Sequence, residues 1–154
     1  MQTRINPYHA APEIMRAQGA LEAAVQGSGL DAGLVELIKT RVSQINGCAF
    51  CIHMHTRDAR KRGETEERLY LLDAWRESSL YTAMERAALA WAEALTLISE
   101  THAPDAVYEE ARSYFDEVSL VKLTILVTTI NAWNRIAIGF RMQHPVRAAA
   151  AASA

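Results

Sequence analysis

The sequence shows no excess of charge of either sign. Its 154 residues include 16 basic and 18 acidic side chains, which gives a net charge of −2, and the densest basic segment is RDARKR. Proteins that bind nucleic acid concentrate Lys and Arg on one surface. This composition therefore argues against a nucleic-acid partner.

Long apolar runs are also missing. The N-terminal segment MQTRINPYHAAPEIMRAQGA lacks the apolar core of a secretory signal peptide. The most apolar segment, residues 120–138, is interrupted by Lys122, Asn131, Asn134 and Arg135, so it fits a buried helix better than a membrane span. We therefore expect a soluble cytoplasmic protein with no membrane partner, in which helix ends or a neighbouring subunit satisfy the two asparagines.

Cysteine is scarce, with Cys48 and Cys51 as the two examples in the chain. Half of the residues are apolar, so a core can form without disulfide bonds. In the cytoplasm, a Cys-x-x-Cys pair is more typical of catalysis or metal binding than of a structural bridge.

Signals for β-strands are absent as well. No segment combines a sustained period of two with turn pairs, whereas apolar residues recur almost everywhere with helical period. The sequence predicts one all-α domain over residues 1–146, with about six to seven helices, followed by an Ala-rich tail, 147–154, that we expect to fray. The expected helices cover, approximately, residues 11–26, 31–46, 48–63, 65–74, 82–98, 104–115 and 119–140.

Capping residues locate several of these helices. Asp31 and Ser119 are placed to cap the second and the seventh helix, and Thr82 with Glu85 has the spacing of a capping box. Gly47 is expected to end the second helix, because glycine tolerates a positive φ. The inner face of the fifth helix should carry side chains spaced by three or four positions: Met84, Ala88, Trp91, Leu95 and Ile98.

The spacing of the helix that follows Gly47 groups three reactive side chains. At about 100° per residue, Cys48, Cys51 and His55 fall within an arc of about 60°. His55 lies one turn after Cys51, so its imidazole can reach that thiol, whereas Cys48 lies beside the unpaired N–H groups and the positive end of the helix dipole. Each effect favours a thiolate, the reactive form, but on a different cysteine. The spacing alone therefore leaves the nucleophile unassigned.

Glu36 is a fourth candidate. If the two helices fold back at Gly47, Glu36 and His55 differ by about three residues, or ~4.5 Å, in their position along the helix axes. A carboxylate and an imidazole could then meet, directly or through water. Glu36 lies opposite Leu34 and Ile38 on its own helix, on a polar side that could face either solvent or a small wet pocket.

Together these residues form the pattern Glu, Cys twelve residues later, then Cys-x-x-Cys-x-x-x-His, here Glu36, Cys48, Cys51 and His55. This pattern resembles the alkylhydroperoxidase D-like (AhpD-like) proteins of the carboxymuconolactone decarboxylase superfamily. The segments INPYHAAPEIMRAQGALEAAV, LLDAWRESSLYTAMERAALAWAEALT and INAWNRIAIGFR also resemble short, stand-alone members, so the likeness covers most of the chain.

The resemblance implies an all-helical fold, with the Cys-x-x-Cys at the start of a central helix, that assembles as a homotrimer or hexamer. It implies a hydroperoxide reductase or disulfide reductase with antioxidant activity, in which Cys51 is the peroxidatic thiol, Cys48 the resolving thiol, and Glu36 and His55 relay protons. No metal or other cofactor is implied. The substrate would be a hydroperoxide and the electron donor a dithiol, which in relatives can be a protein-bound lipoyl group.

Two positions depart from the family pattern. Phe50 stands where the founding peroxidase has a histidine, immediately before the second cysteine, so we expect an incomplete proton path and weaker peroxidase turnover. His53 stands where many similar chains carry an acid, and it points about 160° away from His55 on the helical wheel. We expect it to be a surface histidine.

Other interpretations compete with the redox pair. The cysteines could be inert core residues, or Cys48, Cys51, His55 and Glu36 could bind zinc in a non-enzymatic module, although structural zinc sites usually bring a second Cys/His pair that this chain lacks. A decarboxylase or isomerase acting on lactones without thiols is a further alternative. The cysteine pair counts against it.

Overall fold

The computed structural model describes residues 2–145, and the predicted tail, 147–154, lies outside this range. The described part is helical with no strand, which confirms the all-α prediction. Its nine α-helices exceed the expected number because two of them, α1 and α7, are single turns. The elements are α1 (Pro7–Ala10), α2 (Pro12–Gln26), α3 (Ala32–Asn46), α4 (Ala49–Lys61), α5 (Glu66–Leu71), the 3₁₀ helix η1 (Leu72–Ala74), α6 (Ala83–Thr96), α7 (Ile98–Thr101), α8 (Asp105–Tyr114) and α9 (Glu117–Phe140).

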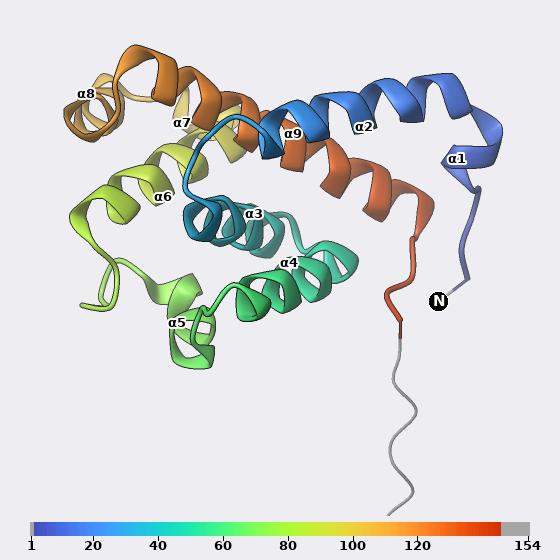
Figure 1. The fold of residues 1–154 in the computed structure, drawn as a ribbon, viewed down its shortest axis with the longest axis horizontal. Coiled ribbons are helices and arrows are strands. Elements are labelled where there is room, and N and C mark those ends of the chain that lie inside the picture. The colour runs from blue at the N-terminus through green and yellow to red at the C-terminus, as the bar shows by residue number, and fades with distance from the viewer. Residues whose placement is uncertain (1, 146–154) are drawn as a thin grey trace, which may run out of the picture.

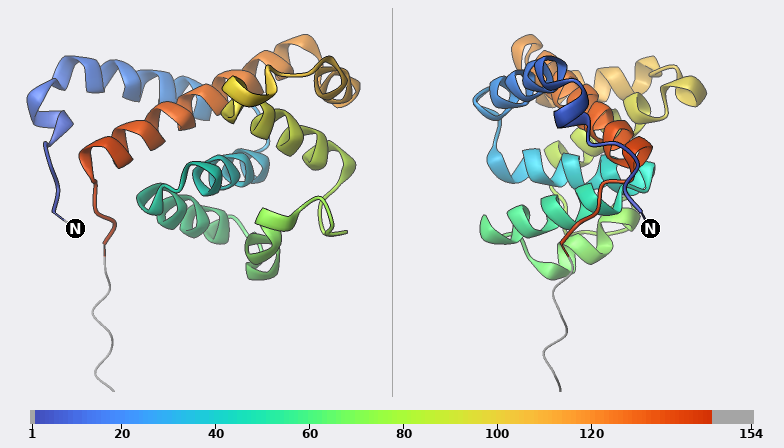
Figure 2. Two further views of the ribbon diagram at one scale, coloured as in Figure 1. Left: turned by 180° about the vertical axis from the view of Figure 1, so that it is seen from behind. Right: turned by 90° about the vertical axis from the view of Figure 1, so that its right-hand side faces the viewer.

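Helix α3 lies at the centre of the fold. It packs against α4, α6 and α9, while α2 packs along α9. Figures 1 and 2 show the long α9 crossing the molecule, with α2 beside it and the α3–α4 hairpin below. The core joins Leu37 and Ile38 of α3 to Leu89 of α6 and to Leu123 and Leu126 of α9, all completely or almost completely buried. Each such side chain contributes about 1.5–3 kcal/mol through burial.

Local signals set the turn that positions the cysteines. Asp31 caps α3 by accepting the N–H of Leu34 at 2.8 Å, as predicted. Gly47 follows α3 with φ of 69°, a left-handed conformation that reverses the chain, so that α4 runs back along α3. Cys48 is then the N-cap of α4, and its Sγ accepts the N–H of Cys51 at 3.3 Å.

The predicted capping box of α6 is present, but the expected inner face of that helix was partly wrong. Ala88 and Trp91 are buried and Leu95 packs against the core. Met84, in the first turn, is 40% exposed, and Ile98 is 51% exposed. Helix α6 ends at Thr96, so Ile98 belongs to α7 and no longer follows the helical phase of the preceding turns.

The start of α9 also corrects a prediction. Asp116, rather than Ser119, is the N-cap, and its carboxylate accepts the N–H of Ser119 at 2.7 Å. A carboxylate at this position also interacts favourably with the positive end of the helix dipole. The hydrogen bond from Ser119 accordingly lowers the pKa of Asp116.

The polar residues that interrupt α9 join it to the end of α3. Asn46, the last residue of α3, donates its side-chain amide to Asn131 Oδ1 at 3.0 Å and to Asn134 Oδ1 at 2.8 Å. Asn134 in turn donates to Ser43 Oγ at 3.1 Å. A helix end therefore satisfies these buried amides, as expected. Within residues 2–145, no helix combines the length and the apolar character needed to span a membrane.

Candidate functional site

Cys48 and Cys51 lie at the N-terminal end of α4 and form a disulfide, with their Cα atoms 5.3 Å apart. Both are buried, and they pack with Ala137 of α9 and with Met142, which follows it. Asn46 binds to α9 just before them in the chain, so the cysteine turn is held against α9 on both sides. The pair is thus part of a rigid junction between three helices.

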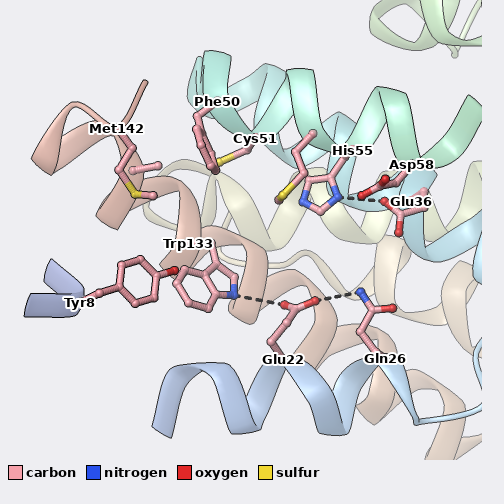
Figure 3. A pocket seen from close by; sticks show the side chains of 12 residues that line it. Tyr8, Glu22, Gln26, Glu36, Phe50, Cys51, His55, Asp58, Trp133 and Met142 are labelled. Carbon is pink, nitrogen blue, oxygen red and sulfur yellow. Dashed lines mark hydrogen bonds and ion pairs between the residues drawn. The ribbon is translucent and has the colours of Figure 1, made fainter. Parts of the chain in front are cut away.

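His55 and Glu36 meet beside this pair. The Nδ1 atom of His55 lies 2.9 Å from Oε2 of Glu36, and both side chains are buried. The fold-back at Gly47 brings the two residues together, as their axial positions predicted, and the polar side of α3 faces inward rather than toward solvent. A histidine that gives one ring N–H to a carboxylate is fixed in orientation and presents its other nitrogen for proton exchange. Figure 3 shows His55 between Cys51 and Glu36.

Arg62 completes the surroundings of Glu36. It follows the last residue of α4, and its Nε lies 3.9 Å from Oε1 of Glu36, while its side chain is about half exposed. The guanidinium therefore lies near the Glu36 oxygen that is not hydrogen-bonded to His55. No feature of the sequence singles out Arg62, because it belongs to a run of charges typical of a solvated helix end.

A cavity of about 330 Å³ borders Cys51, His55 and Glu36. Its other walls are largely apolar and come from α1, α2, α4, α9 and the segment just after α9 (Figure 3). The apolar side chains are those of Tyr8, Phe50, Met54, Trp133, Ala137 and Met142. The cysteine that the family resemblance assigns as nucleophile thus lies on the wall of a chamber large enough for a small organic molecule.

Across the cavity from Cys51, Glu22 forms an ion pair with the buried Lys39. Glu22 of α2 binds Lys39 of α3 through Oε1, which also accepts the side-chain amide of Gln26 at 3.0 Å. Its Oε2 accepts the indole N–H of Trp133 at 3.2 Å. Burial alone would raise the pKa of Glu22, but the hydrogen bonds from Lys39, Gln26 and Trp133, together with the charge of Lys39, lower it overall. Glu22 is therefore ionised at neutral pH.

The pair of Glu22 and Lys39 was not predicted from the sequence. A signal was nevertheless present, because Lys39 lies at helical spacing between the apolar residues Val35 and Val42, and all three side chains are buried in the structure. A buried lysine needs a charged partner. The sequence does not name that partner, since Glu22 lies on a different helix and is brought close by the packing of α2.

His53 lies on α4 outside the cavity that borders Cys51. Its ring is partly buried and stacks on that of His144, with ring centroids 4.9 Å apart. His53 thus stays partly exposed at the surface, as expected, and the chain after α9 returns to cover part of its ring. Within residues 2–145, no group of three or more His, Cys, Asp or Glu side chains is arranged to hold a metal ion.

Known proteins match this chain over most of its length. Residues 12–94 match the model of the carboxymuconolactone decarboxylase family. The uncharacterized protein YdfG of Bacillus subtilis is 47% identical over 138 residues, which cover 90% of this chain and 94% of YdfG.

Solved structures share the fold. A protein of unknown function from Agrobacterium tumefaciens, assigned provisionally to the antioxidant defence proteins AhpD, matches with a TM-score of 0.93 and 50% identity over 95% of this chain and 100% of that one. An uncharacterized peroxidase-related protein from Silicibacter sp. TM1040 matches with a TM-score of 0.78 and 25% identity, over 88% of this chain and 72% of that one.

Proposed function

The chain belongs to the carboxymuconolactone decarboxylase family and has the AhpD-like fold, and we propose that it is a thiol-dependent hydroperoxide reductase. The observation that carries the proposal is the position of Cys51 on a cavity wall beside the hydrogen-bonded pair of His55 and Glu36. The antioxidant and peroxidase-related descriptions of two relatives point to the same class of reaction.

The oxidative half of the cycle begins with the two cysteines reduced. The Cys51 thiolate attacks the O–O bond of a hydroperoxide, ROOH, and becomes a sulfenic acid, while the departing alkoxide takes a proton from His55 and leaves as ROH. The Cys48 thiol then attacks the sulfur of Cys51. A disulfide forms and water leaves, and the oxidised state is the one that the structure contains.

The reductive half needs a dithiol donor, for which a protein-bound lipoyl group is one chemical form. One donor thiolate attacks the disulfide, and the second donor thiol displaces the mixed disulfide, so that both cysteines are reduced and the donor becomes a disulfide. The N–H of Cys51 donates to Cys48 Sγ at the start of α4. This contact stabilises a Cys48 thiolate as the leaving group, so the donor attacks Cys51 from the cavity.

Phe50 limits the proton path. It occupies the position before Cys51 and lines the same cavity with an apolar ring. His55 with Glu36 is then the proton relay of the site, without a second histidine on the α4 wall of the cavity. We therefore expect turnover with hydroperoxide to be slower than in an enzyme with a histidine at position 50.

The test is the intact mass of the protein through one cycle. The reduced protein should lose two hydrogens when treated with one equivalent of hydroperoxide, and a dithiol should restore them. The variant in which both cysteines are serine should consume no hydroperoxide. Retained turnover of a lactone substrate in that variant would instead favour decarboxylase or isomerase chemistry that does not use thiols.

A further inference from the structure

The cavity beside Cys51 has an uneven distribution of charge. Among the described residues that line it are three carboxylates, Glu22, Glu36 and Asp58, but no lysine or arginine. Figure 3 shows Glu22 on the lower wall, across from Cys51, and Glu36 and Asp58 together beyond His55. A bound molecule therefore meets acidic and apolar side chains.

The cations that balance these carboxylates do not line the cavity. Lys39 binds Glu22 from within the protein core, and Lys61 Nζ lies 2.6 Å from Asp58 Oδ1 at the surface. Arg62 approaches Glu36 at 3.9 Å. Each positive charge is thus engaged by a carboxylate and is not presented to the space beside Cys51.

This arrangement discriminates between neutral and anionic ligands. An anion that enters the cavity loses its hydration, and no lysine or arginine lines the walls to replace the lost water, while the imidazole of His55 is already engaged by the carboxylate of Glu36. It also comes near the Glu22 carboxylate, in a site where screening by salt is weak. An uncharged organic molecule meets neither penalty, and it buries its apolar surface against Phe50, Met54, Trp133 and Met142.

Hydrogen bonds fix the position of the Glu22 carboxylate, which repels an anionic ligand. Lys39, Gln26 and Trp133 donate to its two oxygens. A carboxylate has about four acceptor positions, so about one remains free to accept a hydrogen bond from a ligand. Since its side chain is 23% exposed, the carboxylate is accessible from the cavity while its position is fixed by the three donors.

We propose that the cavity selects uncharged organic hydroperoxides and rejects anionic ones, those of fatty acids included, and that Glu22 is the residue that sets this preference. The proposal rests on the hydroperoxide reductase function proposed above. It concerns binding rather than the reaction itself, so it also applies to the alcohols that the reaction produces.

The test compares two probes of similar shape, cumene hydroperoxide and its para-carboxylate derivative, with dithiothreitol as the donor. We expect kcat/KM to be larger for the neutral probe by roughly tenfold or more, mostly through KM, because an unpaired anion is costly to desolvate. In Glu22→Gln this ratio should fall by roughly tenfold. Glu13→Gln changes the net charge equally on the same helix but outside the cavity, so it should leave the ratio as in the wild type.

A double variant controls for a loss of stability in Glu22→Gln. Glu22→Gln leaves Lys39 buried with a weaker partner, so Glu22→Gln combined with Lys39→Met removes both charges and should show the same fall in the ratio. Equal kcat/KM for the two probes in the wild type, or an unchanged ratio in both Glu22 variants, overturns the assignment.

A binding measurement separates this inference from the proposed function. If neither hydroperoxide is consumed, the reductase function fails, but the charge preference is still measured with the two product alcohols, cumyl alcohol and its para-carboxylate, through the fluorescence of Trp133 in the cavity wall. Tighter binding of the neutral alcohol, lost in Glu22→Gln, supports the inference. Equal binding of both alcohols overturns it.

Discussion

Two pairs place a carboxylate on opposite walls of the same cavity: Glu36 with His55, and Glu22 with Lys39, which itself lies in the core. Both use α3, where Glu36 and Lys39 lie one turn apart. The first pair contains a histidine, the side chain that exchanges protons near neutral pH, and it adjoins Cys51. The second joins two fixed charges across α2 and α3. Under the proposals made above, the first pair serves the chemistry, while the second serves the stability of the fold and the charge of the cavity.

Breaking the second pair should have the largest effect on stability. Glu22→Ala leaves the completely buried Lys39 without a partner, so we expect the free energy of unfolding to fall by about 3 kcal/mol. Urea denaturation measures this change. Glu22→Ala combined with Lys39→Met should recover most of the loss, and an equally unstable double variant would show that the charge of Lys39 is not the cause.

Breaking the pair of Glu36 and His55 should mainly lower the reactivity of the Cys51 thiol. His55→Ala removes the imidazole beside Cys51, so alkylation of Cys51 by iodoacetamide at pH 7 should slow by roughly tenfold, and the midpoint of its pH profile should move upward. Peptide mass spectrometry measures the rate at Cys51. His53→Ala is the matched control on the same helix, outside the cavity that borders Cys51, and should change the rate little. Equal profiles in all three proteins would remove His55 from the mechanism.

Lowering the pH should weaken the contribution of the Glu22–Lys39 pair to the free energy of unfolding. The pKa of Glu22 lies below its ordinary value of 4.5 in the folded protein, so its ionisation stabilises the fold above that value, and the contribution is lost as pH falls through the folded-state pKa. Stability measured by urea between pH 6 and pH 3 should therefore fall less steeply in the variant combining Glu22→Gln with Lys39→Met. Glu85 and Glu93, whose pKa values are also lowered by their ion pairs, should maintain part of the slope in both proteins. Identical slopes would show that Glu22 contributes nothing.

Helix α2, which carries Glu22, is expected to pack against a neighbouring subunit. Helix α2 buries only Met15 and Val25, and α9 exposes an apolar stripe that includes Val121 and Ile125. We expect these faces to meet another subunit in a trimer or larger oligomer, detectable by light scattering at low micromolar concentration. Val121→Asp should shift the population toward monomer, with a change in monomer stability within about 0.5 kcal/mol. A wild-type protein that is monomeric would contradict this expectation.

Local signals explain why much of the fold could be predicted. The caps at Asp31 and Thr82 and the reversal at Gly47 involve residues close in sequence, so spacing alone locates them. The meeting of Glu36 and His55 also followed, because a single turn sets the register of α3 against α4. The pairing of Glu22 with Lys39 could not be predicted in this way, because it depends on how α2 packs over α9 and α3.

The wrong predictions concerned helix ends, which the sequence pattern locates poorly. The sequence pattern extended α6 through Ile98, but the helix ends at Thr96, and periodicity does not record where a helix stops. The stacking of His53 on His144 was not an error of this kind; it was simply not predicted, because it depends on the return of the chain after α9, which has no local signal. Asp116 was overlooked because Ser119, three residues later, is an equally acceptable cap by residue type.

The assignment of Cys51 as the nucleophile is the central claim, and trapping of its sulfenic acid tests it most directly. In Cys48→Ser, one equivalent of cumene hydroperoxide should convert Cys51 to a sulfenic acid that dimedone labels, because no resolving thiol remains. In Cys51→Ser, Cys48 should be labelled far more slowly, since it does not line the cavity that Cys51 shares with His55. Peptide mass spectrometry over time gives both rates. Faster labelling of Cys48 would reverse the assignment and show that the helix N-terminus, rather than His55, activates the reactive thiol.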